Sequence, residues 1–169
     1  RYGGRAGKDL AYRIYGKWFE RDTGYLPDAP VEDAWRQARG GFRMDWDASP
    51  DDTITLQGEY YNGYSGDRSV FPIFQGGQIH AVPPYYSFRD GTTYVNGENI
   101  NMNWKRELGE KSDWTLRTYY DRTSRVWQKY DFSNDCTIFD VDFQHRFPMG
   151  TRHAVIWGLG FRNTRDAVA

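Results

Sequence analysis

Residues 38–61 read ARGGFRMDWDASPDDTITLQGEYY, and this stretch decides the fold. Apolar and polar side chains alternate as far as Trp46, the alternation stops at the polar residues 49–52, and it resumes at Ile54. Alternation with a period of two is typical of a β-strand with two unlike faces. The stretch therefore predicts a β-hairpin.

The same pattern occurs twice more, in residues 100–120 and 139–161, and a further alternating run covers residues 10–19. Residues 1–5 look like the end of an earlier strand that reaches a turn at residues 7–9. Each run has about 10 to 12 residues, which suits the ~9 to 11 that a tilted strand needs to cross a membrane. We expect seven full strands and one partial strand in an antiparallel meander, because the turns are too short for crossovers.

The two faces of these runs differ sharply in chemistry. In residues 38–47 one face carries Ala38, Gly40, Phe42, Met44 and Trp46, and the other carries Arg39, Gly41, Arg43, Asp45 and Asp47. A strand with lipid on one side and water on the other has this composition. The predicted fold is all-β, and the strands form part of a transmembrane β-barrel or a small closed form of one.

The connections between the runs alternate in length. Short polar connections cover residues 47–53, 108–113 and 148–153, and longer ones cover residues 21–35, 64–97 and 123–135. Outer-membrane barrels have short periplasmic turns and long external loops. We therefore expect the short turns to face the periplasm of a Gram-negative-type bacterium.

Aromatic residues on the apolar face fall at two heights, which predicts two membrane-interface girdles, since amphipathic rings favour the bilayer interface. Trp46, Trp104, Trp114 and Phe147 lie near the short turns, and Trp18, Tyr60, Tyr120 and Phe161 lie near the longer connections.

The overall composition is polar, with 27% charged residues and a mean hydropathy of −0.85. No apolar run approaches the ~20 residues of a membrane-spanning helix. A barrel remains compatible because only alternate strand residues meet lipid. The 22 basic and 23 acidic residues give no basic excess for nucleic acid. The single cysteine, Cys136, excludes an internal disulfide and is interpreted as a small packed residue.

Four stretches resemble the barrel domain of TonB-dependent outer-membrane receptors: YRIYGK (12–17), AWRQARGGFRMDW (34–46), DVDFQHRF (140–147) and WGLGFR (157–162). The resemblance covers nearly the whole chain. It implies a 22-stranded parent barrel closed by a plug, which imports chelated iron, cobalamin or carbohydrate with energy from the inner membrane.

The resemblance makes residues 1–169 a single barrel segment that lacks the plug domain. The opening residues 1–5 have no apolar signal-peptide core, so we expect an internal or carboxy-terminal fragment. The implied partners are outer-membrane lipid, a TonB-type energy-coupling protein acting through the parent's plug, and an iron–siderophore or similar small ligand. No cofactor and no nucleic acid are implied.

Residues 64–94 form the longest stretch without clear alternation, and they are rich in aromatic side chains. Long loops in compact proteins are often functional. We expect an external loop that contacts ligand or packs over the barrel mouth. The candidate contact residues are Tyr64, Phe71, Phe74, Tyr85, Tyr86 and Phe88, and the candidates on the water-facing side of the strands are Arg43, Glu59, Arg117 and Asp121.

No catalytic or metal site is predicted. His80, His145 and His153 are too scattered in sequence to converge on a metal. Asp140 and Asp142 share one face, but inward-facing arginines offer them counter-charges, so we interpret them as ion-pair partners. The chain is not expected to be an enzyme.

Two alternatives remain open. One is a complete eight-strand outer-membrane barrel with a structural or adhesion role, whose interior would be just wide enough for side chains. The other is a soluble lipocalin-like barrel. That arrangement would turn Trp46, Trp114 and Trp157 inward, and their rings would fill the ligand pocket of the barrel.

Overall fold

The computed structural model describes residues 1–25, 27, 31–79 and 82–169. The chain is all-β, as predicted, and forms an eight-stranded sheet and a two-stranded ribbon. The strands of the sheet are β1 (Tyr2–Ala6), β2 (Leu10–Arg21), β3 (Trp35–Asp47), β4 (Asp52–Pro72), β7 (Tyr86–Gly109), β8 (Ser112–Trp127), β9 (Phe132–Met149) and β10 (His153–Val168). The ribbon pairs β5 (Phe74–Gln75) with β6 (Gln78–Ile79), and a 3-10 turn, η1 (Gln128–Tyr130), joins β8 to β9.

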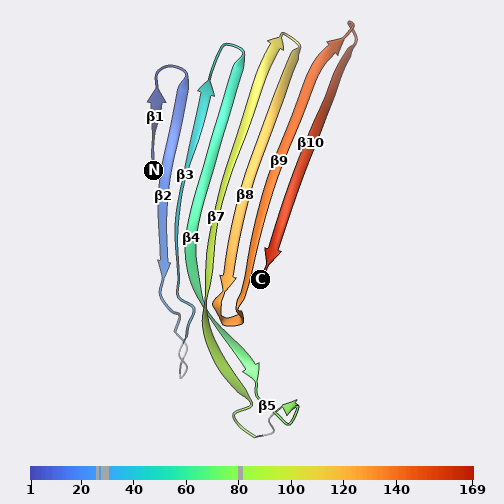
Figure 1. Cartoon of the computed structure of the whole chain (residues 1–169). Coiled ribbons are helices and arrows are strands. Elements are labelled where there is room, and N and C mark those ends of the chain that lie inside the picture. Colours follow the sequence, from blue (N-terminus) through green and yellow to red (C-terminus); the bar gives the residue numbers. More distant parts are fainter. Residues whose placement is uncertain (26, 28–30, 80–81) are drawn as a thin grey trace.

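The order of strands in the sheet follows the chain, and all neighbours are antiparallel, which confirms the predicted meander. Figure 1 shows one layer of strands with the short turns at one end and the β4–β7 hairpin projecting beyond the other strands at the opposite end. The sheet is open in the part of the chain that the structure describes, with β1 at one edge and β10 at the other.

The strand register keeps each predicted face continuous across the sheet. Trp46 lies opposite Ile54, and Ile54 lies opposite Trp104. One residue along, Asp45 lies opposite Thr55, which lies opposite Asn103. We call the first surface the apolar face and the second the charged face.

The described residues contain no buried hydrophobic side chain. The accessible surface is 12445 Å², whereas a compact soluble monomer of this mass exposes about 8,600 Å². The apolar side chains of this chain therefore lie on an outer surface instead of in a core.

Two of the predicted long connections are wrong. Strand β4 continues to Pro72 and β7 begins at Tyr86, so most of residues 64–97 is a hairpin. We call the part that projects beyond the neighbouring strands, residues 66–92, the arm. Only η1 and Asp131 separate β8 from β9, so the predicted connection at residues 123–135 is a tight turn of residues 128–131 between two paired strand ends. The seven full strands have 12 to 24 residues and are longer than the runs predicted from alternation.

Gly41 on the charged face leaves room for the ring of Tyr15. A Cβ at residue 41 would lie 2.7 Å from the carbonyl oxygen of Gly58 and 2.8 Å from Cε1 of Tyr15. We expect Gly41→Ala to lower the free energy of unfolding in lipid vesicles by roughly 1–3 kcal/mol, because the crowded ring must move. Gly160→Ala is the control, since the nearest atom to its added Cβ is 3.7 Å away. Equal losses in a urea titration of the two variants would contradict this packing.

Candidate functional site: an apolar band and a charged face

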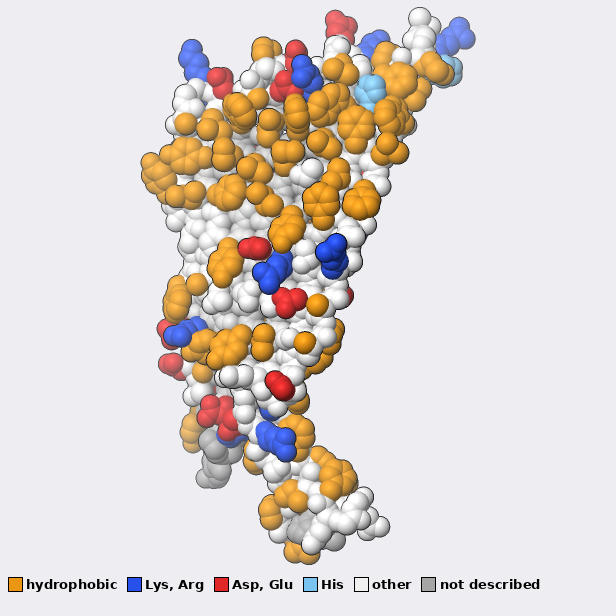
Figure 2. Space-filling model, in the orientation of Figure 1, with side chains coloured by type: hydrophobic (Ala, Val, Ile, Leu, Met, Phe, Trp, Pro, Cys, Tyr) orange, Lys and Arg blue, Asp and Glu red, His pale blue; other side chains and the backbone are white. Residues whose placement is uncertain are grey.

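The apolar face is apolar only over the part of the sheet next to the short turns. On β8 the band runs from Trp114 to Tyr120, and the next residue on that face is Arg122. On β7 it ends at Ile100, and Glu98 follows. Figure 2 shows this hydrophobic band and the charged side chains beyond it. The band covers five residues on β7 and seven to nine on the other full strands. Seven to nine tilted residues span roughly 20–25 Å, close to the ~25 Å apolar band of an outer-membrane barrel.

The girdle near the short turns is a chain of ring contacts. Trp104 and Trp114 meet edge to face with their centroids 4.8 Å apart, and Phe143 meets Trp157 in the same way at 5.5 Å. The indole Nε1 of Trp104 donates a hydrogen bond of 2.8 Å to Asp52 at the band's margin. Trp46 and Phe147 lie on the same face, so all four residues predicted for this girdle are on the apolar face near the short turns. His145 and Trp157 join them, and their rings are 5.9 Å apart.

The second girdle crosses the strand ladder obliquely. Tyr120 on β8 pairs with Ile100 on β7, which pairs with Gly58 on β4. Tyr60 is two residues beyond Gly58 along β4, so the girdle is displaced by two residues between β8 and β4, which are two strands apart. Trp18 and Phe161 continue the same line on β2 and β10. The girdle therefore moves toward the short turns by about one residue for each strand from β2 to β10.

The first girdle is displaced at the same rate in the same direction. Successive strand pairings connect Trp46 on β3 to Phe143 on β9, which is four strands away. The girdle residue on β9 is Phe147, which lies four residues nearer the short turns than Phe143. With ~3.3 Å per residue and ~4.8 Å between strands, one residue per strand corresponds to a tilt of about 35°. Transmembrane barrels tilt their strands by ~35–45°.

The charged face holds ion pairs between neighbouring strands and within them. Glu59 accepts hydrogen bonds from the hydroxyl of Tyr15 and the guanidinium of Arg39. Arg43 donates two hydrogen bonds, of 2.9 and 2.7 Å, to Asp45. Two of the predicted candidates, Arg43 and Glu59, therefore lie together in one hollow of about 220 Å³.

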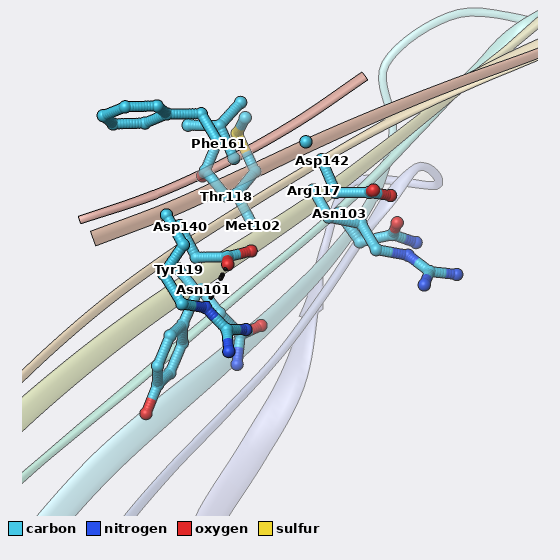
Figure 3. Close-up of a pocket in the computed structure, with 12 residues that line it drawn as sticks. Asn101, Met102, Asn103, Arg117, Thr118, Tyr119, Asp140, Asp142 and Phe161 are labelled. Carbon is cyan, nitrogen blue, oxygen red and sulfur yellow. Dashed lines mark hydrogen bonds and ion pairs between the residues drawn. The ribbon is translucent and has the colours of Figure 1, made fainter. Parts of the chain in front are cut away.

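A larger hollow of about 850 Å³ lies over β7–β10 on the same face, and Arg117 is among its lining residues. Figure 3 shows amide, guanidinium and carboxylate groups around it, from Asn101, Asn103, Arg117, Tyr119, Asp140 and Asp142. Asp140 accepts a hydrogen bond of 2.7 Å from Arg162, which is the ion-pair role predicted for it. Asp121 does not line either hollow. These groups can hydrogen-bond a polar solute.

The six aromatic candidates of residues 64–94 do not converge on one point. The strand ladder puts Tyr86 and Phe88 on one side of the arm, in edge contact at 5.6 Å, and Phe71 on the other side. Phe71 lies 6.4 Å from Tyr130, and Tyr64 contacts Tyr94 at the root of the arm at 6.3 Å. Phe74 and Tyr85 belong to the end of the arm, and both are exposed.

A lysine that the sequence analysis did not select fixes the arm to the sheet. The side chain of Lys129 in η1 is only 5% exposed and forms a 2.8 Å ion pair with Asp67. Its Nζ also donates to the carbonyl oxygens of Asp67 and Arg89, each at 3.1 Å, and to the hydroxyl of Ser69 at 2.9 Å. Gly91 makes this approach possible, because a Cβ there would lie 2.7 Å from Cβ of Lys129.

The arm contains an ion pair that makes its stability depend on pH. Arg68 donates hydrogen bonds of 2.5 and 2.6 Å to Asp90, and these bonds lower the pKa of the Asp90 carboxyl. The ion pair with ionised Asp90 stabilises the folded arm at pH values above the ordinary aspartate pKa of ~3.9. This stabilisation is lost as the pH falls through the lowered pKa of Asp90, because the carboxyl is then protonated. We expect arm amides to exchange hydrogen faster below that pH, after correction for intrinsic exchange. Asp90→Asn should remove this dependence, and an unchanged profile in the variant would contradict it.

Residues 1–25, 27, 31–79 and 82–169 contain no group of three His, Cys, Asp or Glu side chains that could hold a metal ion. His80 lies outside the described residues. Cys136 is half-buried, and partial burial with the nearby Asp166 raises the pKa of its thiol. No helix among the described residues is long and apolar enough to span a membrane.

Comparisons with protein-family models, curated proteins and solved structures gave no match to this chain.

Proposed function

We propose that this chain is a wall segment of an outer-membrane β-barrel of the TonB-dependent receptor type. Its apolar face contacts lipid, and its charged face borders the water-filled lumen. The proposal rests on one observation: two aromatic girdles bound an apolar band along parallel lines with the tilt of a barrel, and no hydrophobic side chain of the described residues is buried.

Exposure of this band to water would be unfavourable. Trp18 and Phe161 are each 60% exposed and Leu159 is 70% exposed. Transfer of apolar surface from water to hydrocarbon gains about 25 cal/mol per Å². Lipid is therefore the environment that best accounts for the apolar band. A soluble lipocalin-like barrel would have to enclose the band in its interior.

The open edges support a larger barrel over a closed eight-strand one. In the described part of the chain β1 and β10 are the two edges of the sheet and do not pair with each other. In hydrocarbon each unpaired backbone group costs several kcal/mol. We therefore propose that further strands of the receptor pair with both edges.

The resemblance to TonB-dependent receptors supplies the proposed activity, which is import of a chelated metal, a siderophore complex or a similar scarce nutrient. A TonB-type protein would provide energy through the plug of the complete receptor. The polar lumen face and the arm opposite the short turns suit uptake from the external side.

The membrane assignment is tested by refolding the full chain with and without phosphatidylcholine vesicles. We expect the circular dichroism of β-structure with vesicles and its absence in buffer alone. A monomeric β-rich state in buffer would contradict the proposal.

The arm is expected to carry ligand recognition in the complete receptor, because rigid scaffolds commonly place recognition on projecting loops. The variant lacks residues 66–92 and joins Ser65 to Thr93, which already pair with each other. Binding of ferric siderophores and cobalamin should be lost while barrel folding is kept. Unchanged affinity would direct the search to Arg43, Glu59, Arg117 and Asp121 on the charged face.

A further inference from the structure

Two pairs of like charges lie directly across from each other on the charged face. The register of β2 and β3 places Arg13 opposite Arg43 and Lys17 opposite Arg39. Like charges directly opposite each other destabilise a sheet. The two pairs lie on one face with only the row of Tyr15 and Gly41 between them, and together they are a cost that needs a compensating charge.

The nearby carboxylates are already engaged. Asp45 accepts both hydrogen bonds of Arg43 and a third, of 2.9 Å, from Thr55. Glu59 is held by Tyr15 and Arg39. Arg13 and Lys17 form no ion pair within 4 Å in the described part of the chain.

Open space adjoins these cations. A hollow of about 350 Å³ is lined by Arg1, Arg13, Tyr15, Gly16, Lys17 and Arg39, and none of these residues is acidic. The Nε of Arg39 is buried and has no hydrogen-bond partner among the described residues. The ring of Tyr15 fills the place that a side chain at residue 41 would take. The site therefore combines unpaired positive charge, an unused donor and room for a small molecule.

We propose that Arg13, Lys17 and Arg39 bind a small multivalent anion that carries carboxylate or phosphate groups. This proposal rests on the proposed function in one respect, the exposure of the charged face to water. A guanidinium fork binds carboxylate and phosphate oxygens with two parallel hydrogen bonds, and the lysine adds a point charge. An anion between the two rows offsets the repulsion in both like-charge pairs.

The opposite half of the face lacks this excess. Arg117 and Arg162 line the larger hollow together with Asp140 and Asp142, so its cations are balanced by carboxylates. Anion binding is therefore expected next to β2 and β3 and not over β8 to β10.

Isothermal titration of the full chain, refolded in vesicles at low salt, tests the proposal with two probes. Tricarballylate represents carboxylates, inorganic pyrophosphate represents phosphates, and glucose is the neutral control. Arg13→Gln and Lys17→Gln should each weaken anion binding about tenfold or more, the loss expected for one charge-assisted hydrogen bond. Arg13→Lys should restore part of the affinity. Arg146→Gln should leave it unchanged, because Arg146 lies on β9 and is paired with Asp113.

Binding of either anion with this pattern supports the site, and the tighter probe identifies the group that it prefers. Failure to bind both anions at millimolar concentration would overturn the proposal, as would equal weakening by Arg146→Gln. A chain that gains β-structure with vesicles and binds no anion refutes this site alone. A chain that folds as a monomer in buffer refutes the membrane assignment instead.

Discussion

Replacing Met102 with arginine is expected to destabilise the chain by about 2–4 kcal/mol in a lipid bilayer, the cost of arginine near the midplane on a barrel's lipid face. Met102 lies on the apolar face opposite Leu56, midway between the two girdles. Leu56→Arg and Val141→Arg test the same face, and we expect a smaller loss for Val141 because it lies nearer the second girdle. The measurement is a urea titration of the refolded chain in vesicles.

Asn101→Arg is the matched control for Met102→Arg. Asn101 is the next residue on β7, and the strand pleat places it on the charged face between Gln57 and Tyr119. Arginine there remains in water, so we expect a loss of less than about 1 kcal/mol. Gln57→Ala and Asp142→Ala should likewise cost far less than the arginine substitutions on the apolar face. Similar losses for Asn101→Arg and Met102→Arg would mean that the faces are wrongly assigned.

Loss of the Lys129 side chain is expected to release the arm from the sheet. Lys129→Ala removes an ion pair and three hydrogen bonds from a position that is 5% exposed, and it leaves Asp67 without its cation. Removal of hydrogen bonds to a charged group costs ~1.5–3 kcal/mol. We expect about 2 kcal/mol less protection in hydrogen exchange for arm amides, with little change in the amides of the apolar band.

Lys105→Ala is the control for this prediction. Lys105 also forms an ion pair, 3.0 Å from Glu107, but its side chain is 41% exposed. Exposed ion pairs contribute ~0–1 kcal/mol. If both variants leave arm protection unchanged, Lys129 does not hold the arm.

The strands and their faces could be predicted from the sequence because each face repeats locally. Trp104, Met102 and Ile100 are two residues apart, so a short window shows both the strand and its apolar side. The girdle residues follow from the same parity. The oblique path of the girdles could not be derived, since it depends on the register between strands.

The arm was missed because the contacts that order it are distant in sequence. Residues 65–69 read SGDRS and have no apolar alternation. Arg68 meets Asp90 twenty-two residues away, and Lys129 meets Ser69 sixty residues away. Long-range pairs of this kind leave no periodic signal. The proposed anion site could not be predicted from the sequence for the same reason. The strand register places Arg13 opposite Arg43 and Lys17 opposite Arg39, and neither strand alone shows that register.

Accessibility along strand β7 distinguishes a face that contacts lipid from a face that contacts water. Single cysteines at residues 98 to 104 of β7, in a Cys136→Ala background, carry spin labels in the chain refolded into vesicles. We expect labels at residues 100, 102 and 104 to collide mainly with oxygen dissolved in lipid. Labels at 99, 101 and 103 should collide mainly with a water-soluble nickel chelate. Labels without this alternation, or with the opposite one, would contradict a wall that has lipid on its apolar face and water on its charged face.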